Sequence, residues 1–167
     1  MGLGLFFFKK INREYYKDIP FGLLILNFIV QRVFRLSCKV PFSVNFTSKV
    51  KGYDVMEIHK SVWKSIAISN GLYIVAFHNG KLIIKENTII APNVVINNGN
   101  HDLIDRSIHH VKDIVIGKNC WIGANSVILG GTKLGNNVTV AAGSVVNIEF
   151  PDNVVIGGAP AKVIKRL

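Results

Sequence analysis

The sequence predicts an all-β fold, a parallel β-helix, and three observations support this prediction. An aliphatic residue returns every six positions in the second half of the chain, at Ile116, Ile122, Ile128, Leu134, Val140 and Val146. The next residue is usually Gly or Ala, and a compact residue such as Cys120 or Ser126 comes four positions after the aliphatic one. This period fits neither a helix nor an alternating strand, but it is typical of short strands that end in tight corners. We expect the aliphatic and compact residues to point inward, and Gly or Ala to help the chain turn.

Length, charge and cysteine content limit the possible classes of protein. The 167 residues suffice for one domain with a sizeable core, and the formal net charge is +10. No nucleic-acid-binding motif accompanies that charge, so we expect no nucleic-acid partner. Two cysteines, Cys38 and Cys120, are too few for a disulfide framework and indicate a reducing compartment. We expect a cytoplasmic protein, which could lie peripherally at the inner face of the membrane.

Residues 1–40 lack the repeat and form the first predicted region. They contribute half of the net charge, and no apolar run among them is long enough to span a bilayer. The spacing predicts a helix with one broad apolar face, made of Phe21, Leu24, Phe28, Val33 and Leu36. Two interpretations stay open. The helix could cap the open end of the solenoid, or it could lie on an anionic membrane surface.

Residues 41–167 form the predicted β-helix domain. An earlier register is expected through Ile66, Leu72, His78, Ile84, Ile90 and Ile96, with His78 at an inward or corner position. The next register begins at Ile116, twenty residues after Ile96. We interpret those twenty residues as two hexads and a loop insertion at about 102–109, directly after His101. Loops that leave a rigid solenoid often carry function. After Phe150–Pro151 we expect a last short strand, a turn and a basic tail.

The chain resembles the hexapeptide-repeat acyltransferases with a left-handed β-helix, in particular the sugar and polysaccharide O-acetyltransferases. The resemblance covers about residues 58–167. It rests on residues 90–96, on Asn100-His101-Asp102, on residues 116–124 with Cys-Trp-Ile-Gly, on residues 142–146, and on Gly158-Ala-Pro-Ala-Lys162. It implies a homotrimer with acetyl-CoA in the groove between neighbouring solenoids and a sugar or glycan as the acceptor. It implies no metal.

The resemblance also assigns roles to individual residues. His101 matches the catalytic histidine, and a neutral imidazole suits a general base. Either Asp102 or Asp105 could orient its ring. The acetyl-CoA site is expected to include Trp121, Ala124 (whose N–H would stabilise the oxyanion), Ala142, Gly143, Lys162 and Lys165. The acceptor site is expected to include His78, Asn79, Asn100 and Asp102. Family members often have Pro after the catalytic histidine, and Asp102 at that position fits the polysaccharide-modifying group better than the galactoside and maltose enzymes.

The predicted function is therefore acetyl-CoA-dependent O-acetylation of a sugar hydroxyl, in surface polysaccharide such as capsule or lipopolysaccharide, by direct transfer in a ternary complex. Four alternatives stay open. N-acetylation of an amino sugar needs the same base, and Glu57-Ile58-His59 faintly resembles a serine acetyltransferase motif. A γ-type carbonic anhydrase would need paired histidines four residues apart, a spacing that none of the five histidines has. The fourth alternative is a non-catalytic trimeric scaffold.

Overall fold

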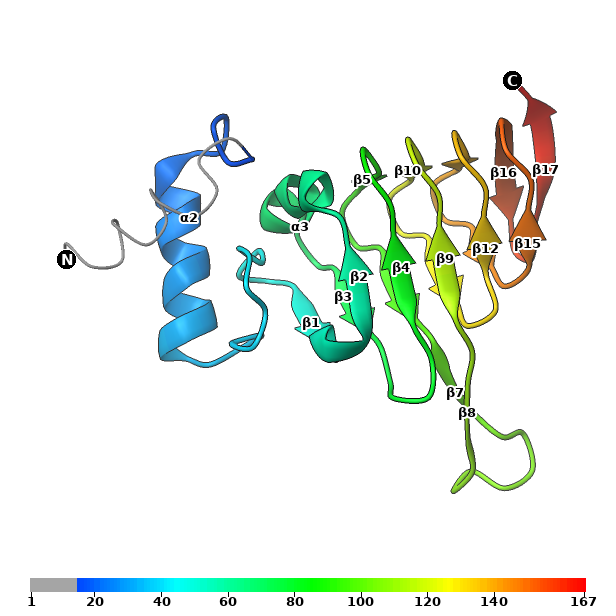
Figure 1. The fold of residues 1–167 in the computed structure, drawn as a ribbon, viewed down its shortest axis with the longest axis horizontal. Helices are drawn as coiled ribbons and strands as arrows, with labels where there is room; N and C mark the ends of the chain where they lie inside the picture. Colours follow the sequence, from blue (N-terminus) through cyan, green and yellow to red (C-terminus); the bar gives the residue numbers. More distant parts are fainter. Residues whose placement is uncertain (1–14) are drawn as a thin grey trace.

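The computed structural model describes residues 15–167, and most of them wind into a three-sided parallel β-helix (Figure 1). Sheet A has the strand order β1-β3-β6-β11-β14, sheet B β2-β4-β9-β12-β15, and sheet C β5-β10-β13-β16-β17. Within these sheets only the β16–β17 pair is antiparallel.

The strands of sheet A are β1 (Lys49–Lys51), β3 (Tyr73–Val75), β6 (Val95–Asn97), β11 (Val127–Leu129) and β14 (Val145–Val146). Those of sheet B are β2 (Met56–Ile58), β4 (Leu82–Ile84), β9 (Ile114–Ile116), β12 (Lys133–Leu134) and β15 (Glu149–Phe150). Those of sheet C are β5 (Ile89–Ile90), β10 (Trp121–Ile122), β13 (Thr139–Val140), β16 (Val154–Gly158) and β17 (Ala161–Arg166). The predicted parallel β-helix is confirmed.

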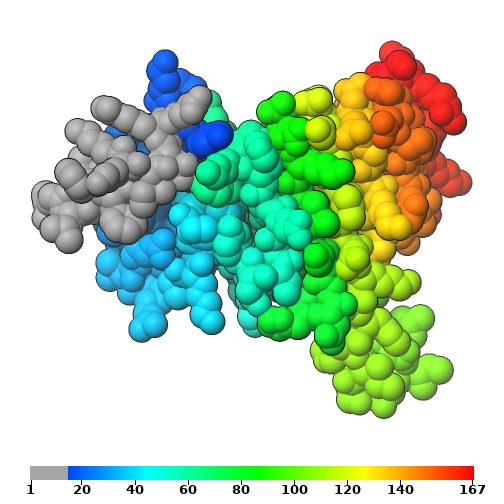
Figure 2. All heavy atoms as spheres, viewed as in Figure 1, coloured from blue at the N-terminus to red at the C-terminus, as the bar shows by residue number. Residues whose placement is uncertain are grey.

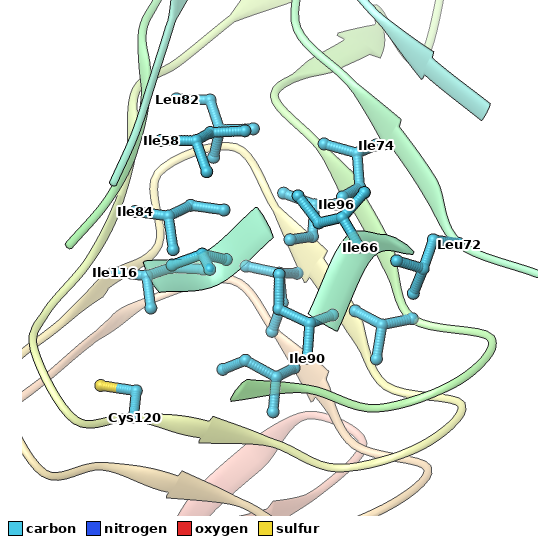
Figure 3. Close-up of a cluster of buried hydrophobic side chains, with 14 of the residues drawn as sticks. Ile58, Ile66, Leu72, Ile74, Leu82, Ile84, Ile90, Ile96, Ile116 and Cys120 are labelled. Atoms are coloured by element: carbon cyan, nitrogen blue, oxygen red, sulfur yellow. The ribbon is translucent and has the colours of Figure 1, made fainter. Parts of the chain in front are cut away.

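The core is a column of mostly aliphatic side chains from the inward positions of the strands, stacked along the inside of the prism. In sheet C, for example, Ile90 aligns with Ile122 and Ile122 with Val140. All three are buried, and Figure 3 shows the apolar cluster that Ile90 and its neighbours build. The compact residues four positions later, such as Cys120 and Ser126, are buried too. Burying one such aliphatic side chain stabilises the fold by about 1.5–3 kcal/mol. The register predicted from Ile116 onward is therefore confirmed.

The corners are turned by a different residue from the one expected. At most corners the third residue after the aliphatic position has a positive φ. It is asparagine at Asn87, Asn93, Asn119, Asn125 and Asn137, and glycine at Gly131 and Gly143. Asparagine tolerates this left-handed conformation better than other residues with a side chain. Gly117 has another reason to be glycine, because an added Cβ would lie 2.1 Å from the Gly135 carbonyl oxygen of the next coil. The residue three positions after the aliphatic one therefore turns the chain. The glycine directly after the aliphatic residue, as at Gly117, lets neighbouring coils approach closely.

The earlier predicted register is wrong between Ile66 and Ile84. Ile66 lies in the helix α3 (Trp63–Ile68), and the inward residue of β3 is Ile74, which pairs with Ile96. His78 is exposed in the turn between β3 and β4. The true steps are eight residues from Ile66 to Ile74 and ten from Ile74 to Ile84. Together they span eighteen residues, the length of three hexads, so two irregular steps imitate a regular repeat.

The predicted insertion is also larger than expected. Ile96 and Ile116 occupy successive inward positions on sheets A and B, because Ile96 pairs with Ile128 and Ile116 with Ile84. Twenty residues therefore replace a single hexad. The second hexad that the sequence predicts after the insertion, at residues 110–115, is absent. The surplus forms an antiparallel hairpin of β7 (Gly99–His101) and β8 (His109–Val111). This hairpin projects from one corner of the solenoid (Figures 1 and 2).

The N-terminal segment covers the β1 end of the solenoid. Residues 1–14 of this predicted region lie outside the described residues. The helix α2 (Phe21–Phe28) continues into a π-helical turn (Ile29–Val33). Short 3-10 turns at Tyr53–Val55 and Lys60–Val62 complete the first coil. The inward side of α2 is polar at Asn27 and Gln31, which are buried, whereas Phe21, Val33 and Leu36 are exposed. The predicted apolar face thus largely points away from the solenoid.

Candidate active site

The β7–β8 hairpin is anchored by one buried side chain, that of Asn98. The side-chain oxygen of Asn98 accepts a hydrogen bond from the Phe77 N–H at 2.8 Å. The backbone carbonyl oxygen of Asn98 accepts one from the Lys112 N–H at 3.0 Å. Beside it, Gly99 packs so closely that an added Cβ would lie 2.6 Å from the Phe77 ring. The base of the hairpin is therefore fixed against the β3–β4 turn of the preceding coil.

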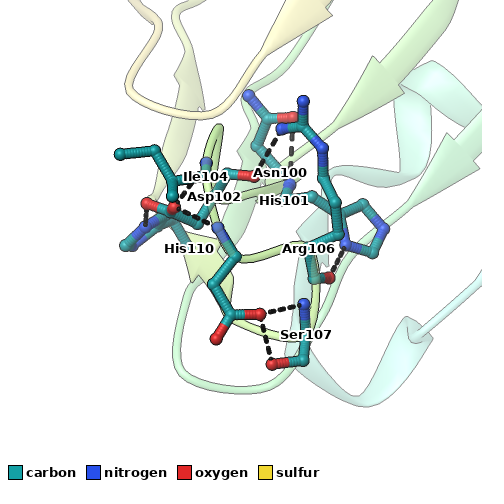
Figure 4. Close-up of polar contacts among 8 residues, drawn as sticks. Asn100, His101, Asp102, Ile104, Arg106, Ser107 and His110 are labelled. Atoms are coloured by element: carbon teal, nitrogen blue, oxygen red, sulfur yellow. Dashed lines mark hydrogen bonds and ion pairs between the residues drawn. The ribbon is translucent and has the colours of Figure 1, made fainter.

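His101 ends β7, and its ring is held by the backbone of the hairpin turn (Figure 4). Its Nδ1 lies 2.7 Å from the carbonyl oxygen of Arg106. A carbonyl oxygen can only accept, so Nδ1 carries the hydrogen and donates it. In the neutral imidazole the lone pair then lies on Nε2. The ring of His109, opposite in the hairpin register, packs against His101 with 4.3 Å between ring centroids. His101 is thus exposed, oriented and in the tautomer that a base requires.

Asp102 does not orient His101. Its Oδ2 lies 3.0 Å from Nε2 of His110, and its Oδ1 accepts the N–H groups of Ile104 and Asp105. The hydrogen bond from His110, followed by these two backbone bonds, lowers the pKa of Asp102 to about 2. Asp105 does not reach His101 either, because its Oδ1 binds the Ser107 hydroxyl and N–H. Both carboxylates shape the hairpin turn, and the predicted orienting role belongs to the Arg106 carbonyl.

The residues predicted for the acceptor site divide between two neighbouring segments. Asn100 lies on β7, where its Oδ1 accepts the His101 N–H at 3.1 Å. His78 and Asn79 lie in the β3–β4 turn, which packs against the base of the hairpin through Asn98. His78 is exposed, with Nε2 3.3 Å from Asp54, so the expected inward or corner position is wrong. The four additional residues of this turn, compared with a hexad, push His78 out of the core.

Trp121 lies on the outer face of sheet C. Its side chain is 55% exposed, although an indole usually gains from burial. The pairing register forms a row from Trp121 through Thr139 and Val155 to Lys165. Strands in a sheet are about 4.8 Å apart, so this row extends roughly 14 Å. Lys162 lies on the same last strand, paired with Gly157. An exposed aromatic ring and two lysines therefore lie on one sheet.

The small residues Ala124, Ala142 and Gly143 lie at the corner that joins sheet C to sheet A. The Gly143 N–H donates to the Ala124 carbonyl oxygen at 2.8 Å, which stacks the two turns in successive coils. Ala142 and Gly143 are exposed, and a Cβ added to Gly143 would meet no atom within 4 Å. This corner leaves open space beside Trp121's sheet, where an extended ligand can approach the backbone.

Within one protomer, these two groups of residues do not meet. The hairpin with His101 leaves the corner after the strands of sheet A, whereas Ala124 and Gly143 lie at the corner before them. A strand length of sheet A therefore separates the predicted base from the predicted acetyl-CoA residues. Among residues 15–167, no three His, Cys, Asp or Glu side chains cluster as a metal site.

Three features of the site are absent from the sequence prediction: the Arg106 carbonyl, the packing of His109 on His101, and the Asn98 anchor. The first two depend on the hairpin register, which the hexad pattern does not contain. A signal for Asn98 existed, because a polar residue directly after a strand is a candidate anchor for a loop.

Comparisons with known proteins agree with this architecture. The family model described as bacterial transferase hexapeptide (six repeats) matches residues 113–147. The putative acetyltransferase YJL218W of Saccharomyces cerevisiae is 38% identical over 98 residues, covering 56% of this chain and 50% of that protein. The putative lipopolysaccharide biosynthesis O-acetyl transferase WbbJ of Escherichia coli is 29% identical over 172 residues, covering 86% of each chain. The chain thus spans only half the length of its yeast relative.

A solved structure resembles the fold. The hexapeptide-repeat acetyltransferase VCA0836 of Vibrio cholerae, solved with acetyl-CoA, superimposes with a TM-score of 0.54 and 28% identity over 76% of this chain and 65% of that one. The six-residue repeat, the three-sided solenoid and these relatives lead to one conclusion: the chain is similar to the hexapeptide-repeat acetyltransferases and has the left-handed β-helix fold.

Proposed function

We propose that this protein transfers an acetyl group from acetyl-CoA to a hydroxyl group of a sugar in a surface polysaccharide. The observation that carries the proposal is the hydrogen bond from His101 Nδ1 to the Arg106 carbonyl, which leaves Nε2 as the proton acceptor. The relatives support the chemical class, since WbbJ is named a putative O-acetyl transferase and VCA0836 was solved with acetyl-CoA.

The reaction needs few groups. His101 Nε2 removes the proton of the acceptor hydroxyl while its oxygen attacks the thioester carbonyl carbon. The N–H of Ala124 donates to the developing oxyanion. The C–S bond then breaks, and the imidazolium returns its proton to the departing thiolate, so the products are the sugar ester and free CoA. The buried Cys120 takes no part, because burial raises the pKa of its thiol and keeps it from acting as a nucleophile.

We infer that acetyl-CoA lies along sheet C and that the enzyme works as a homotrimer. The exposed Trp121, the open corner at Gly143 and the cations Lys162 and Lys165 suit an extended ligand with phosphates at one end. The separation of this surface from His101 within one protomer is the reason for the trimer. A neighbouring copy would bring its hairpin to this surface, so each site would combine residues from two protomers.

A single experiment tests this function. The full chain is incubated with acetyl-CoA and a panel of sugars, nucleotide sugars and glycan fragments, and release of free thiol is followed. We expect turnover with a hydroxyl acceptor and an alkali-labile product, which distinguishes an ester from the amide that an amino sugar would give. No turnover on any acceptor, together with no rise in thermal stability on adding CoA, would contradict the proposal.

A further inference from the structure

The N-terminal helix has the reverse of the usual arrangement of polar and apolar side chains. Its fully buried residues are Asn27 and, in the π-helical turn that follows, Gln31, with 0% and 3% of their surface exposed. Leu23 and Leu24 are partly buried and pack against the core beside them. Asn27 donates to the Ser43 hydroxyl and the Ala67 carbonyl, and Gln31 donates to the Phe42 carbonyl at 2.9 Å. These bonds seat the helix on the first coil through polar contacts. Folding alone therefore does not use most of the apolar side of the helix.

Several large apolar residues of the helix and of the turn that follows it are exposed, and we call this set the outer face. Val33 and Phe34 are 66% and 68% exposed, values far above those of core residues. The members of the outer face are Phe21, Ile25, Leu26, Ile29, Val33, Phe34 and Leu36. A patch of large apolar residues of this extent marks an interaction surface, because leaving it in water is costly.

The charge around the outer face is mostly positive. No acidic residue occurs between Asp18 and Asp54, and that interval contains Arg32, Arg35, Lys39, Lys49 and Lys51, all of them exposed. Four of these cations line a groove of about 1100 Å³ next to the outer face, together with Leu36 and one acidic residue, Asp54. The apolar surface and the basic groove thus adjoin.

We propose that the outer face binds the surface of an anionic lipid bilayer. The apolar side chains would enter the interfacial region while the neighbouring cations contact lipid phosphates. The proposal places the helix along the bilayer surface. Among the described residues, no helix is long and apolar enough to cross a membrane. A second copy of the chain fits less well, since a two-fold contact would bring two sets of these cations together, and Asp54 alone among the residues that line the groove is acidic.

Vesicle flotation of the full chain tests this proposal. Vesicles of phosphatidylcholine alone are compared with vesicles that also contain phosphatidylglycerol, at low and high salt. We expect flotation with the anionic vesicles that weakens as salt increases. Val33→Ser with Phe34→Ser should reduce the partition coefficient about ten-fold, because two exposed apolar side chains no longer enter the bilayer. Lys39→Gln should lower the preference for anionic vesicles.

Leu167→Ser is the matched control, since Leu167 is an exposed apolar residue at the far end of the solenoid. It should float like the parent protein. Two results would overturn the proposal: no flotation with anionic vesicles at low salt, or unchanged flotation of the Val33/Phe34 variant. The outer face would instead bind a second copy if three results came together. The parent protein would form larger assemblies in sedimentation, the Val33/Phe34 variant would not, and the parent protein would not float with vesicles. Thiol release in solution should be the same for all of these variants, so failure here is separate from failure of the acetyltransferase proposal.

Discussion

The β7–β8 hairpin and the regular wall of coils from Ile116 to Val146 use their residues in opposite ways. The wall buries its aliphatic column almost completely and turns its corners with asparagine or glycine. The hairpin buries little beyond its Asn98 anchor and holds exposed histidines by hydrogen bonds to a turn. Stability is therefore concentrated in the wall, and the proton chemistry that we propose is concentrated in the hairpin. Substitutions in the two regions should separate these properties.

The largest effect is expected at His101. His101→Ala should lower kcat about 10²–10⁴-fold, because it removes the proposed general base. It should leave the free energy of unfolding within about 0.5 kcal/mol, since the side chain is exposed. Thiol release and urea unfolding measure the two quantities. A variant as active as the parent protein would remove His101 from the mechanism.

In the wall, Ile128→Ala should cost about 2–5 kcal/mol of stability, because it leaves a cavity in the fully buried column. The activity per folded molecule should stay near that of the parent protein. Ile148→Ala serves as the control, since Ile148 is half exposed and should change stability by less than about 0.5 kcal/mol. Equal losses from both substitutions in urea unfolding would show that the column is not the main source of stability.

A smaller effect is expected on sheet C. Trp121→Ala should raise the KM for acetyl-CoA about ten-fold, because an exposed indole that contacts the ligand is lost. The KM for the acceptor should change little. If instead kcat falls and the KM for acetyl-CoA is unchanged, Trp121 is not part of the surface that binds acetyl-CoA.

The smallest effect concerns Asp102, and it depends on pH. Because its pKa is lowered to about 2 in the fold, its ionised form stabilises the hairpin above the ordinary pKa of an aspartate, near 3.8. That stabilisation is lost as the pH falls from about 4 to 2. The Tm difference between the parent protein and Asp102→Asn should thus be constant above about pH 5 and vanish near pH 2. A difference that does not depend on pH would show that the carboxylate charge has no such role.

The sequence predicted the wall well because no insertion interrupts it from Ile116 to Val146. It failed between Ile66 and Ile84, where two irregular steps add up to a multiple of six. It located the hairpin through its surplus length but could not show that His101 contacts the Arg106 carbonyl and His109, because such contacts depend on strand pairing. The direction of α2 was also missed, since a helical pattern identifies an apolar face but not what that face contacts.

The central claim is that His101 and the sheet C surface of Trp121 come together between protomers. Co-expression of His101→Ala with Trp121→Ala, followed by purification of mixed assemblies through two tags, tests this claim directly. In a purified mixed trimer, about one site in three would be built from two intact halves. We therefore predict that mixed assemblies regain about a third of the parent activity at an acetyl-CoA concentration below the KM of the Trp121 variant. Activity no higher than the average of the two separate variants would contradict a site shared between protomers.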